Sequence, residues 1–305
     1  MTDRIAIIGA GEVGAASAYA LLQGSLYKEI LLVDIKPEKR DGQVRDLSDA
    51  CYAEDSSTRV RAGTYKEAGE CDIVVITAGS KRTRGETSLQ LVERNTAILR
   101  RIINSMRPFR SDLIMIVVSH PVDVLTTLAQ KLSGLPTRQV IGSGTFLDTV
   151  RLRRMLADRF EVATGPVSAY VLGEHGDSQF VAWSLASIDG VPIGEALPEK
   201  EFNREELAEE CKREGQRIVD TKGAIAFGIA SVVSNICGSI IFDRRDVRPV
   251  SHFQPELDCC VSMPVVLGRH GVVKSLPLPL SSEEKAKLAE SAHIVREAAQ
   301  QLLGP

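Results

Sequence analysis

Residues 5–14 read Ile-Ala-Ile-Ile-Gly-Ala-Gly-Glu-Val-Gly, an apolar run that passes directly into a glycine-rich turn. The apolar run predicts a buried strand, and a helix is predicted from about Glu12 to Gln23. Between them, Gly9 permits a tight turn and Gly11 lets the backbone approach a pyrophosphate, while Gly14 allows the helix to pack closely. The amino end of that helix then faces the phosphate charge. Strand, turn and helix in this order predict a dinucleotide site, whereas a glycine pattern alone is only a common turn.

The first half of the chain alternates short β-branched runs with helical stretches. The runs are continuously apolar, as in strands that are buried on both faces of a sheet. This alternation predicts an α/β fold with a doubly wound parallel sheet, a Rossmann-type domain over residues 1–143. The predicted strands are Arg4–Ile8, Ile30–Val33, Asp72–Thr77, Leu113–Val118 and Val140–Gly142, and a helix is predicted from Ser88 to about Arg107.

The pattern changes after residue 143, where we expect a second, α+β domain that carries substrate and catalytic groups over residues 144–305. No repeat, low-complexity tract or linker separates the two halves, so we expect them to pack tightly together. The predicted helices of this half are Leu147–Phe160, Glu201–Gly223 and Ser281–Leu303, and its predicted antiparallel strands are Val167–Leu172 and Val181–Ile188.

The composition is that of an ordinary globular protein, with 44% apolar and 25% charged residues among 305. A net charge of -3 provides no bulk attraction for nucleic acid or for an anionic membrane. The run from Ile225 to Phe242 is strongly apolar, but it contains Asn235, three serines and two glycines. This run therefore predicts a buried helix rather than a membrane span.

The six cysteines have neither the paired spacing of a disulfide framework nor a metal-binding CxxC repeat. No secretory signal precedes the first predicted strand. We therefore expect free thiols, no bound metal and a reducing, cytoplasmic compartment.

Asp34 ends the second predicted strand, where a carboxylate can bond both ribose hydroxyls and repel a 2′-phosphate. The next residue is Ile35, not an arginine, which favours NAD over NADP. The other residues expected to line the cofactor are Glu12, Val13, Lys39, Tyr65, Thr77, Ala78, Gly79 and Val118.

Two further segments carry chemistry: Leu147-Asp148-Thr149-Val150-Arg151 and Glu174-His175-Gly176. Asp148 and Arg151 fall on one face of a predicted helix, and His175 has a pKa near neutrality in water. Taken alone, the pair is a helical salt bridge and the histidine a structural residue. Beside a nucleotide site, they predict a proton-transfer set with an anion grip, suited to hydride chemistry on a small 2-oxo or 2-hydroxy acid.

With these motifs the chain resembles the L-lactate and malate dehydrogenase family over nearly its whole length, and the bacterial L-lactate dehydrogenases most. The resemblance implies that His175 is the acid–base group, that Asp148 orients it and that Arg151 grips the substrate carboxylate. It also implies a homodimer or homotetramer. The matching segments are GAGEVG (9–14), Asp34, Asp46-Leu47, ITAG (76–79), GETSLQLVERN (85–95), PVDVLT (121–126), GSGTFLDTVRLR (142–153) and GEHGDS (173–178).

Three positions depart from the family pattern around one pocket. Ser88 stands where a mobile loop usually carries an arginine that polarises the substrate carbonyl. His120 replaces an asparagine before Pro-Val-Asp, and Ile225 aligns with a threonine of the substrate pocket. Loss of one preorganised donor to the developing oxyanion slows catalysis by about 10²–10³-fold. Arg82 or Arg84 on the same loop, or His120 itself, would have to compensate.

These departures leave the substrate open. Arg82 aligns with the position where arginine accompanies oxaloacetate and glutamine accompanies pyruvate, so it favours malate, whereas Ile225 favours an apolar side chain. The leading hypothesis is an NAD-dependent L-2-hydroxyacid dehydrogenase of the lactate type. The alternatives are a malate dehydrogenase, a reductase of an atypical 2-oxo acid or imine, and an NAD-binding protein without turnover.

Overall fold

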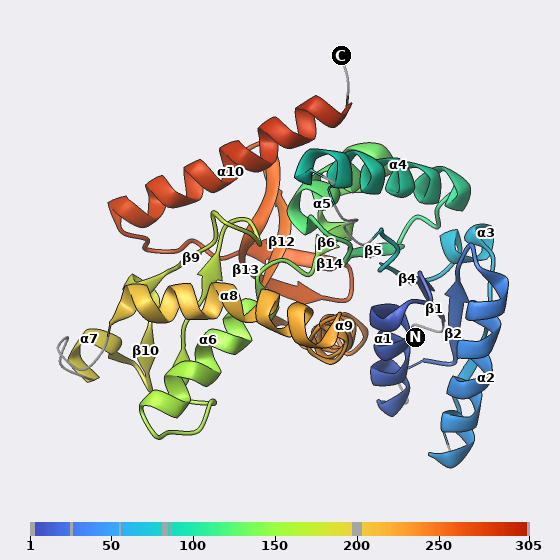
Figure 1. The fold of residues 1–305 in the computed structure, drawn as a ribbon, viewed down its shortest axis with the longest axis horizontal. Coiled ribbons are helices and arrows are strands. Elements are labelled where there is room, and N and C mark those ends of the chain that lie inside the picture. Colours follow the sequence, from blue (N-terminus) through green and yellow to red (C-terminus); the bar gives the residue numbers. More distant parts are fainter. Residues whose placement is uncertain are drawn as a thin grey trace.

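The computed structural model describes residues 4–24, 27–54, 56–80, 85, 87–196 and 203–303. Within these residues, one sheet of nine strands runs through the molecule in the order β14-β13-β12-β6-β5-β4-β1-β2-β3 (Figure 1). The order 6-5-4-1-2-3 of its parallel part is that of a doubly wound dinucleotide fold. The strands are β1 (Arg4–Ile8), β2 (Glu29–Val33), β3 (Arg59–Ala62), β4 (Ile73–Ile76), β5 (Ile114–Val117), β6 (Val140–Gly142), β12 (Asp246–Gln254), β13 (Cys259–Gly268) and β14 (Gly271–Ser275).

Helices cover both faces of this sheet, which explains why its strands are continuously apolar. Successive side chains of a strand point to opposite faces, so Ile5 packs in one core with helices α1 and α9, and Ala6 packs in the other with α4, α5 and α10. The fold class predicted from the sequence is thereby confirmed. The helices are α1 (Glu12–Gln23), α2 (Pro37–Ala53), α3 (Tyr65–Gly69), α4 (Ser88–Met106), α5 (Val122–Ser133), η1 (Thr137–Gln139), α9 (Ala226–Ile241) and α10 (Ser282–Leu303).

The remaining elements form a smaller lobe beside the sheet, at the lower left of Figure 1. They are α6 (Phe146–Arg159), β7 (Val167–Ser168), β8 (Val171–Leu172), β9 (Phe180–Val181), η2 (Trp183–Leu185), β10 (Ser187–Ile188), β11 (Val191–Pro192), α7 (Ile193–Ala196) and α8 (Arg204–Lys222). Helix α8 begins after Asn203, whose side chain accepts hydrogen bonds from the first free backbone amides, and it ends at Gly223 with φ 88°.

Two strand predictions for this lobe are wrong. The expected strand Val167–Leu172 is two short strands in different sheets, because β7 pairs with β10 while β8 pairs with β9. The expected strand Val181–Ile188 is likewise broken by the 3₁₀ turn η2. Both interruptions have one cause: the chain crosses between two small sheets, and a continuous apolar run does not reveal such a crossing.

Strands β12, β13 and β14 were not expected from the sequence. They extend the parallel sheet with antiparallel strands, and β12 joins β6 where Ser251 faces Gly142. The strand pattern is hidden by Pro249 and Pro264, since proline within a run argues against a strand. The sheet consequently passes across the predicted boundary at residue 143 without a break.

Helix α9 covers the run that was predicted to be a buried helix rather than a membrane span. None of the described helices is long and apolar enough to cross a membrane. Helix α9 is only partly buried, however, because Phe227 is 72% exposed and lies on its outer face.

Candidate active site

Asp148 and Arg151 project from one face of α6, three residues apart. Helix α6 begins at Phe146, shortly after β6 ends, so both side chains lie near the carboxyl end of the parallel strands. They are almost completely buried, with 1% of Asp148 and 6% of Arg151 exposed. Nη1 of Arg151 lies 3.1 Å from Oδ1 of Asp148, so the two groups form an ion pair.

His175 reaches the same point from the loop that follows β8. The loop turns at Gly173, whose φ of 87° favours glycine, and Gly173 pairs by its backbone with Ser262 on β13. Nδ1 of His175 then lies 2.7 Å from Oδ2 of Asp148, and about a third of the imidazole, 33%, is exposed. Because Nδ1 faces the carboxylate, Nε2 is the ring nitrogen that can exchange a proton with a bound molecule.

Charge fixes the protonation state of this pair. Burial alone lowers the pKa of His175, but the Asp148 carboxylate outweighs it and raises that pKa to about 9. Burial also opposes ionisation of Asp148, yet the charges of His175 and Arg151 hold the Asp148 pKa below its ordinary value. At neutral pH the pair is therefore an imidazolium facing a carboxylate, ready to act as an acid.

Arg151 has donor capacity left after pairing with Asp148. Its Nη2 is buried and has no hydrogen-bond partner within the part of the chain that the structure describes. A buried cationic donor without a partner is costly, and a ligand carboxylate is the group that completes a guanidinium fork. The arrangement therefore suits a carboxylate-bearing molecule beside His175.

His120 lies at the opening of the same site, in the segment between β5 and α5. Its ring centroid is 6.1 Å from that of His175, and the two rings are nearly perpendicular. Loss of hydration by burial and the positive charge of His175 both lower the pKa of His120, so its ring is neutral at pH 7. A neutral imidazole keeps one N–H donor that can be offered to an oxygen atom of a ligand.

Ile225 lies beside Arg151, at the start of α9. A Cβ added to Gly215 on α8 would come within 3.6 Å of Ile225 Cδ1 and 3.3 Å of Arg151 Nη1. Gly215 therefore borders the space between the cation and the apolar side chain. Sequence reasoning did not identify Gly215 as a site residue. Its spacing of four from Cys211 nevertheless places Gly215 on the α8 face that packs on α6.

Three predicted residues of the substrate loop are not placed by this geometry. Arg82 and Arg84 lie outside the described residues, and so does the side chain of Ser88. The described backbone shows helix α4 beginning after Thr87, which accepts a hydrogen bond from Gln90 N–H in a capping box.

The glycine turn lies between β1 and α1 as the sequence predicts. Gly9 has φ 107°, and a Cβ on Gly14 would come within 1.8 Å of the Gly9 carbonyl oxygen, so neither position accepts another residue easily. A Cβ on Gly11 would meet no atom within 4 Å, which leaves open space at the amino end of α1. The turn thus has the shape that suits a pyrophosphate, and it lies at the amino end of a helix.

Asp34 lies next to this turn. Its Oδ2 accepts a hydrogen bond of 2.7 Å from Ala10 N–H, so the carboxylate is fixed at the edge of the site. Ile35 beside it is 80% exposed and adds no positive charge for a 2′-phosphate. These features suit NAD.

The other residues expected at the cofactor lie along the same edge. Glu12 and Val13 form the first turn of α1, and Lys39 is exposed on the first turn of α2. Tyr65 opens α3, and partial burial together with the nearby Asp34 charge raises its pKa. All three helices therefore begin at the carboxyl ends of parallel strands.

Thr77, Ala78 and Gly79 follow β4. The Thr77 hydroxyl donates to the Gly9 carbonyl at 3.0 Å, which ties this segment to the glycine turn. Val118 follows β5 and packs against the core. Two neighbouring strand ends thus form the wall opposite α1.

Sequence reasoning missed residues that hold these segments together. Asn95 on α4 donates to the His120 carbonyl at 2.8 Å and accepts from Ser80 N–H at 2.8 Å. Asp123 on α5 accepts from the backbone of His175. Both belong to motifs noted in the sequence, but only the fold reveals which segments they join.

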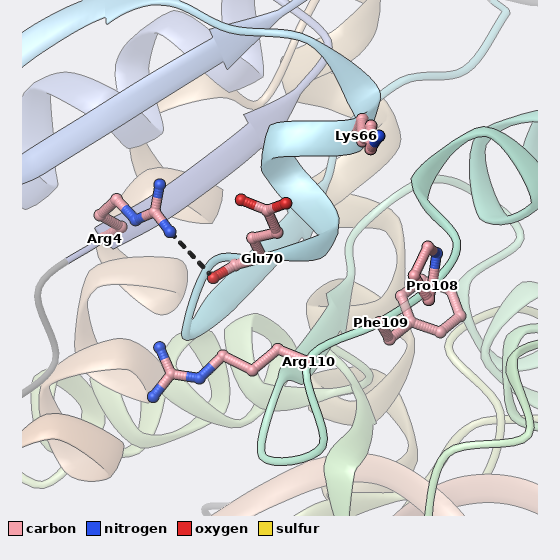
Figure 2. Close-up of a pocket in the computed structure, with 6 residues that line it drawn as sticks. All are labelled: Arg4, Lys66, Glu70, Pro108, Phe109 and Arg110. Carbon is pink, nitrogen blue, oxygen red and sulfur yellow. Dashed lines mark hydrogen bonds between the residues drawn. The ribbon is translucent and has the colours of Figure 1, made fainter.

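A separate hollow of about 440 Å³ lies at the amino ends of the strands, lined by the residues drawn in Figure 2. Arg4 there donates to the Glu70 carbonyl at 3.3 Å, and Arg110 pairs with Asp72 at 2.8 Å. Both arginines are thus engaged, and the hollow lies at the sheet edge opposite the glycine turn. Among the described residues, no group of three or more His, Cys, Asp or Glu is arranged to hold a metal ion.

Comparison with known families agrees with the geometry. The model of the lactate/malate dehydrogenase NAD binding domain matches residues 3–142, and that of the lactate/malate dehydrogenase alpha/beta C-terminal domain matches residues 145–303. Together they span nearly the whole chain.

Individual relatives are similar over nearly their full lengths. L-lactate dehydrogenase A of Rhizopus oryzae is 44% identical over 294 residues, 96% of this chain and 91% of the relative. L-lactate dehydrogenase of Acetivibrio thermocellus is 37% identical over 303 residues, 96% of this chain and 95% of the relative. The crystal structure of a lactate dehydrogenase from a Medee basin deep-sea metagenome library superposes with a TM-score of 0.94 at 32% identity, covering 100% of both chains.

Proposed function

Because the chain belongs to the lactate/malate dehydrogenase family, we propose that it is an L-lactate dehydrogenase-like enzyme that interconverts a 2-oxo acid and its L-2-hydroxy acid. It is an NAD-dependent oxidoreductase, as its NAD binding domain and its relatives indicate. The observation that carries the assignment of residues is the 2.7 Å contact between His175 and Asp148, next to an Arg151 nitrogen that lacks a partner.

Held by the glycine turn and Asp34, NADH would supply the hydride for C2 of the 2-oxo acid. Arg151 binds the substrate carboxylate through its available Nη2, which places the keto group near His175. The proton on Nε2 of His175 passes to the keto oxygen as C2 is reduced, which leaves a neutral imidazole. Before this transfer, Asp148 stabilises the imidazolium. Oxidation of the hydroxy acid reverses this transfer, with neutral His175 as the base.

We also assign His120 a part in this reaction. Its neutral ring lies 6.1 Å from His175, which is a suitable separation for two groups that contact one small molecule. An N–H of His120 would then polarise the keto oxygen. It would take over the role of the loop arginine, whose usual position is occupied here by Ser88. Arg84 is the other candidate for this role, and the variants His120→Ala and Arg84→Ala decide between them by which one loses kcat.

A second substrate candidate is a 2-oxo acid with an apolar side chain larger than that of pyruvate. The supporting observation is that Gly215, Ile225 and Arg151 lie together, so a methyl group and not a hydroxyl stands near the guanidinium. Recognition of malate or of an imine would depend on Arg82 and on the side chain of Ser88, which lie outside the described residues.

Steady-state oxidation of NADH tests the proposed function. Pyruvate, oxaloacetate, phenylpyruvate, branched 2-oxo acids and mixtures of 2-oxo acids with amines form the panel. We expect turnover with at least one ketone, and we expect His175→Asn to abolish it. Binding of NADH without turnover of any compound would refute the proposal and leave a nucleotide-binding protein.

We further propose that residues 1–143 bind the cofactor and that residues 144–305 hold the substrate. This division is supported by the positions of Asp34 in the first part and Arg151 in the second. Asp34→Ala in the intact chain should weaken NADH binding, measured by fluorescence, and Arg151→Ala should not. Equal losses in both variants would contradict the division.

We propose that the enzyme assembles as a homotetramer or homodimer in the cytoplasm. A groove of about 760 Å³ lies between α1 and α9, where Tyr19, Phe227 and Phe242 are 47%, 72% and 50% exposed. All six cysteines are buried and unpaired, which suits a reducing compartment. Light scattering of the wild type and of Phe227→Asp tests the assembly, and cell fractionation tests the compartment.

A further inference from the structure

Asp123 is a buried carboxylate that the proposed reaction does not use. It lies in the first turn of α5, and only 1% of it is exposed. Its Oδ2 accepts a hydrogen bond of 2.6 Å from the backbone N–H of His175. A buried carboxylate is unfavourable unless neighbouring groups compensate for its lost hydration. The neighbours of Asp123 therefore indicate its role.

Those neighbours join the three segments that make the candidate active site. Ser262 on β13 donates its hydroxyl toward Oδ1 of Asp123 at 3.5 Å and accepts from Thr145 N–H at 3.0 Å, just before α6 begins. The backbone of Ser262 also exchanges hydrogen bonds of 2.8 and 3.1 Å with Gly173. Asp123 and Ser262 thus connect the His175 loop to the helix that carries Asp148.

The charges around His175 are arranged to favour its protonated form. Asp148 on α6 contacts the ring directly, Asp123 on α5 lies behind the backbone, and Arg151 on α6 opposes them. His120, whose ring lies edge-on to that of His175, is neutral at pH 7. A second carboxylate is therefore available to offset the guanidinium, whose positive charge would otherwise make the imidazolium less stable.

Among the described residues, the titratable groups that act on Asp123 are His175 and Glu174 on the loop and the thiols of Cys259 and Cys260 on β13, and the Ser251 hydroxyl favours its ionised form. Burial raises the pKa of both thiols, so they carry no charge near neutral pH. Burial raises the Asp123 pKa to about 6, so the carboxylate is ionised at pH 7 and the facing charge that stabilises it is that of His175.

We propose that Asp123 is a positioning residue for proton transfer: its carboxylate anchors the backbone of His175 and supplies a second negative charge that stabilises the imidazolium. The inference rests on the proposed function, in which His175 is the acid–base group. It predicts that the charge of Asp123 and its hydrogen bond have separable effects.

Asp123→Asn separates the two effects, because an amide oxygen still accepts from His175 N–H but carries no charge. We expect the His175 pKa, followed by NMR titration of the apoprotein, to fall by about one unit. The high-pH limb of 2-oxo-acid reduction should move by the same amount, with the KM for NADH unchanged. The His175 resonance is assigned from its loss in His175→Gln.

Two further variants complete the test. Asp123→Glu keeps the charge but displaces the anchor, so the His175 pKa should stay near that of the wild type while kcat falls. Glu284→Gln is the matched control, because Glu284 is 6% exposed and also accepts from a backbone amide, that of Ser184 at 3.0 Å, away from His175. It should leave the titration of His175 unchanged.

An unchanged His175 pKa in folded Asp123→Asn would overturn the charge assignment, and so would an equal shift in Glu284→Gln. If Asp123→Asn does not fold, Asp123→Glu still decides, because a lowered His175 pKa in that variant contradicts the proposal. A wild type without turnover of any 2-oxo acid would refute the proposed function instead. The titration needs neither substrate nor cofactor, so the two failures are distinguishable.

Discussion

Replacement of Asp148 by asparagine is the most direct perturbation of the candidate active site. Asparagine has nearly the same shape and still offers an oxygen to Nδ1 of His175, so the 2.7 Å contact can persist. What is removed is the negative charge that raises the His175 pKa against the effect of burial. The variant thus isolates the charge of Asp148 from its size.

The magnitude follows from the change in protonation. In the wild type, burial lowers the His175 pKa, but the Asp148 carboxylate, with an added contribution from Asp123, outweighs burial and raises that pKa to about 9. Without Asp148, burial and Arg151 act unopposed by the nearest carboxylate, so we expect the His175 pKa to fall to about 6.5 or below. At about pH 7.5 the protonated fraction then falls from nearly all to about a tenth, which is a loss of about tenfold in the rate of reduction.

The sign determines the assay. In the proposed reaction, reduction of a 2-oxo acid needs protonated His175, so activity should be present below the folded-state pKa and be lost as pH rises through it. Initial rates of NADH oxidation, measured with saturating substrate from about pH 5.5 to pH 10, should fall near pH 9 in the wild type and near or below pH 6.5 in Asp148→Asn. Oxidation of the hydroxy acid, which needs neutral His175, should show the opposite limb at the same pH.

Identical pH profiles for the wild type and a folded Asp148→Asn would refute the reasoning, because they would show that Asp148 does not set the charge of the titrating group. A uniform loss of rate at every pH would likewise contradict it, since that result indicates lost orientation of the ring without a shifted pKa.

Three other substitutions test the remaining geometry. Arg151→Lys keeps a charge but not the guanidinium fork, so the KM for the 2-oxo acid should rise by about 10²-fold while the Kd for NADH, from fluorescence, stays unchanged. Gly14→Ala would place a Cβ 1.8 Å from the Gly9 carbonyl oxygen, so thermal unfolding should show a Tm lower by several degrees and NADH binding should weaken; an unaltered Tm would contradict the packing. Gly215→Ala adds a methyl group 3.6 Å from Ile225 Cδ1, so kcat/KM for branched 2-oxo acids should fall relative to pyruvate, and an equal effect on both would argue against that pocket.

The parallel half of the fold could be predicted because its signals are local. Strand β1 was expected with the bounds that the structure has, since residues 5–8 are apolar and the glycine turn follows at once. The end of α4 was predicted at about Arg107 and lies at Met106, because Pro108 cannot continue a helix.

The antiparallel extension could not be predicted in the same way. Strand β12 contains Pro249 and the buried polar residues Ser251 and His252, so its sequence has neither apolar continuity nor clean alternation. The side chain of His252 has its partner on a distant strand, because its Nε2 lies 2.8 Å from the Ser275 hydroxyl on β14. Such pairing depends on contacts far apart in the sequence, which a local pattern does not contain.

The candidate site shows the same division between local and distant information. Asp148 and Arg151 were expected to share a helical face because they are three residues apart, and this is a local property. Asp123 had no predicted role, because its partner is the backbone of His175, 52 residues away. Residue type and spacing identify groups that act on a ligand, whereas groups that position them become visible only when the chain is folded.

The order of the strands explains why hydride and proton transfer share one edge of this sheet. In a doubly wound sheet, every crossover helix begins where a parallel strand ends, so the amino ends of the helices gather at one edge. The glycine turn follows β1, His120 and Asp123 follow β5, and Asp148 follows β6. The antiparallel strand β13 then brings Ser262 to this edge, and its bridge to Gly173 delivers His175 from the second half of the chain. The proposed acid–base residue therefore depends on strands that were absent from the sequence prediction. For this reason Ser262→Val, which removes the hydroxyl that contacts Thr145 N–H and Asp123, should reduce kcat without weakening NADH binding.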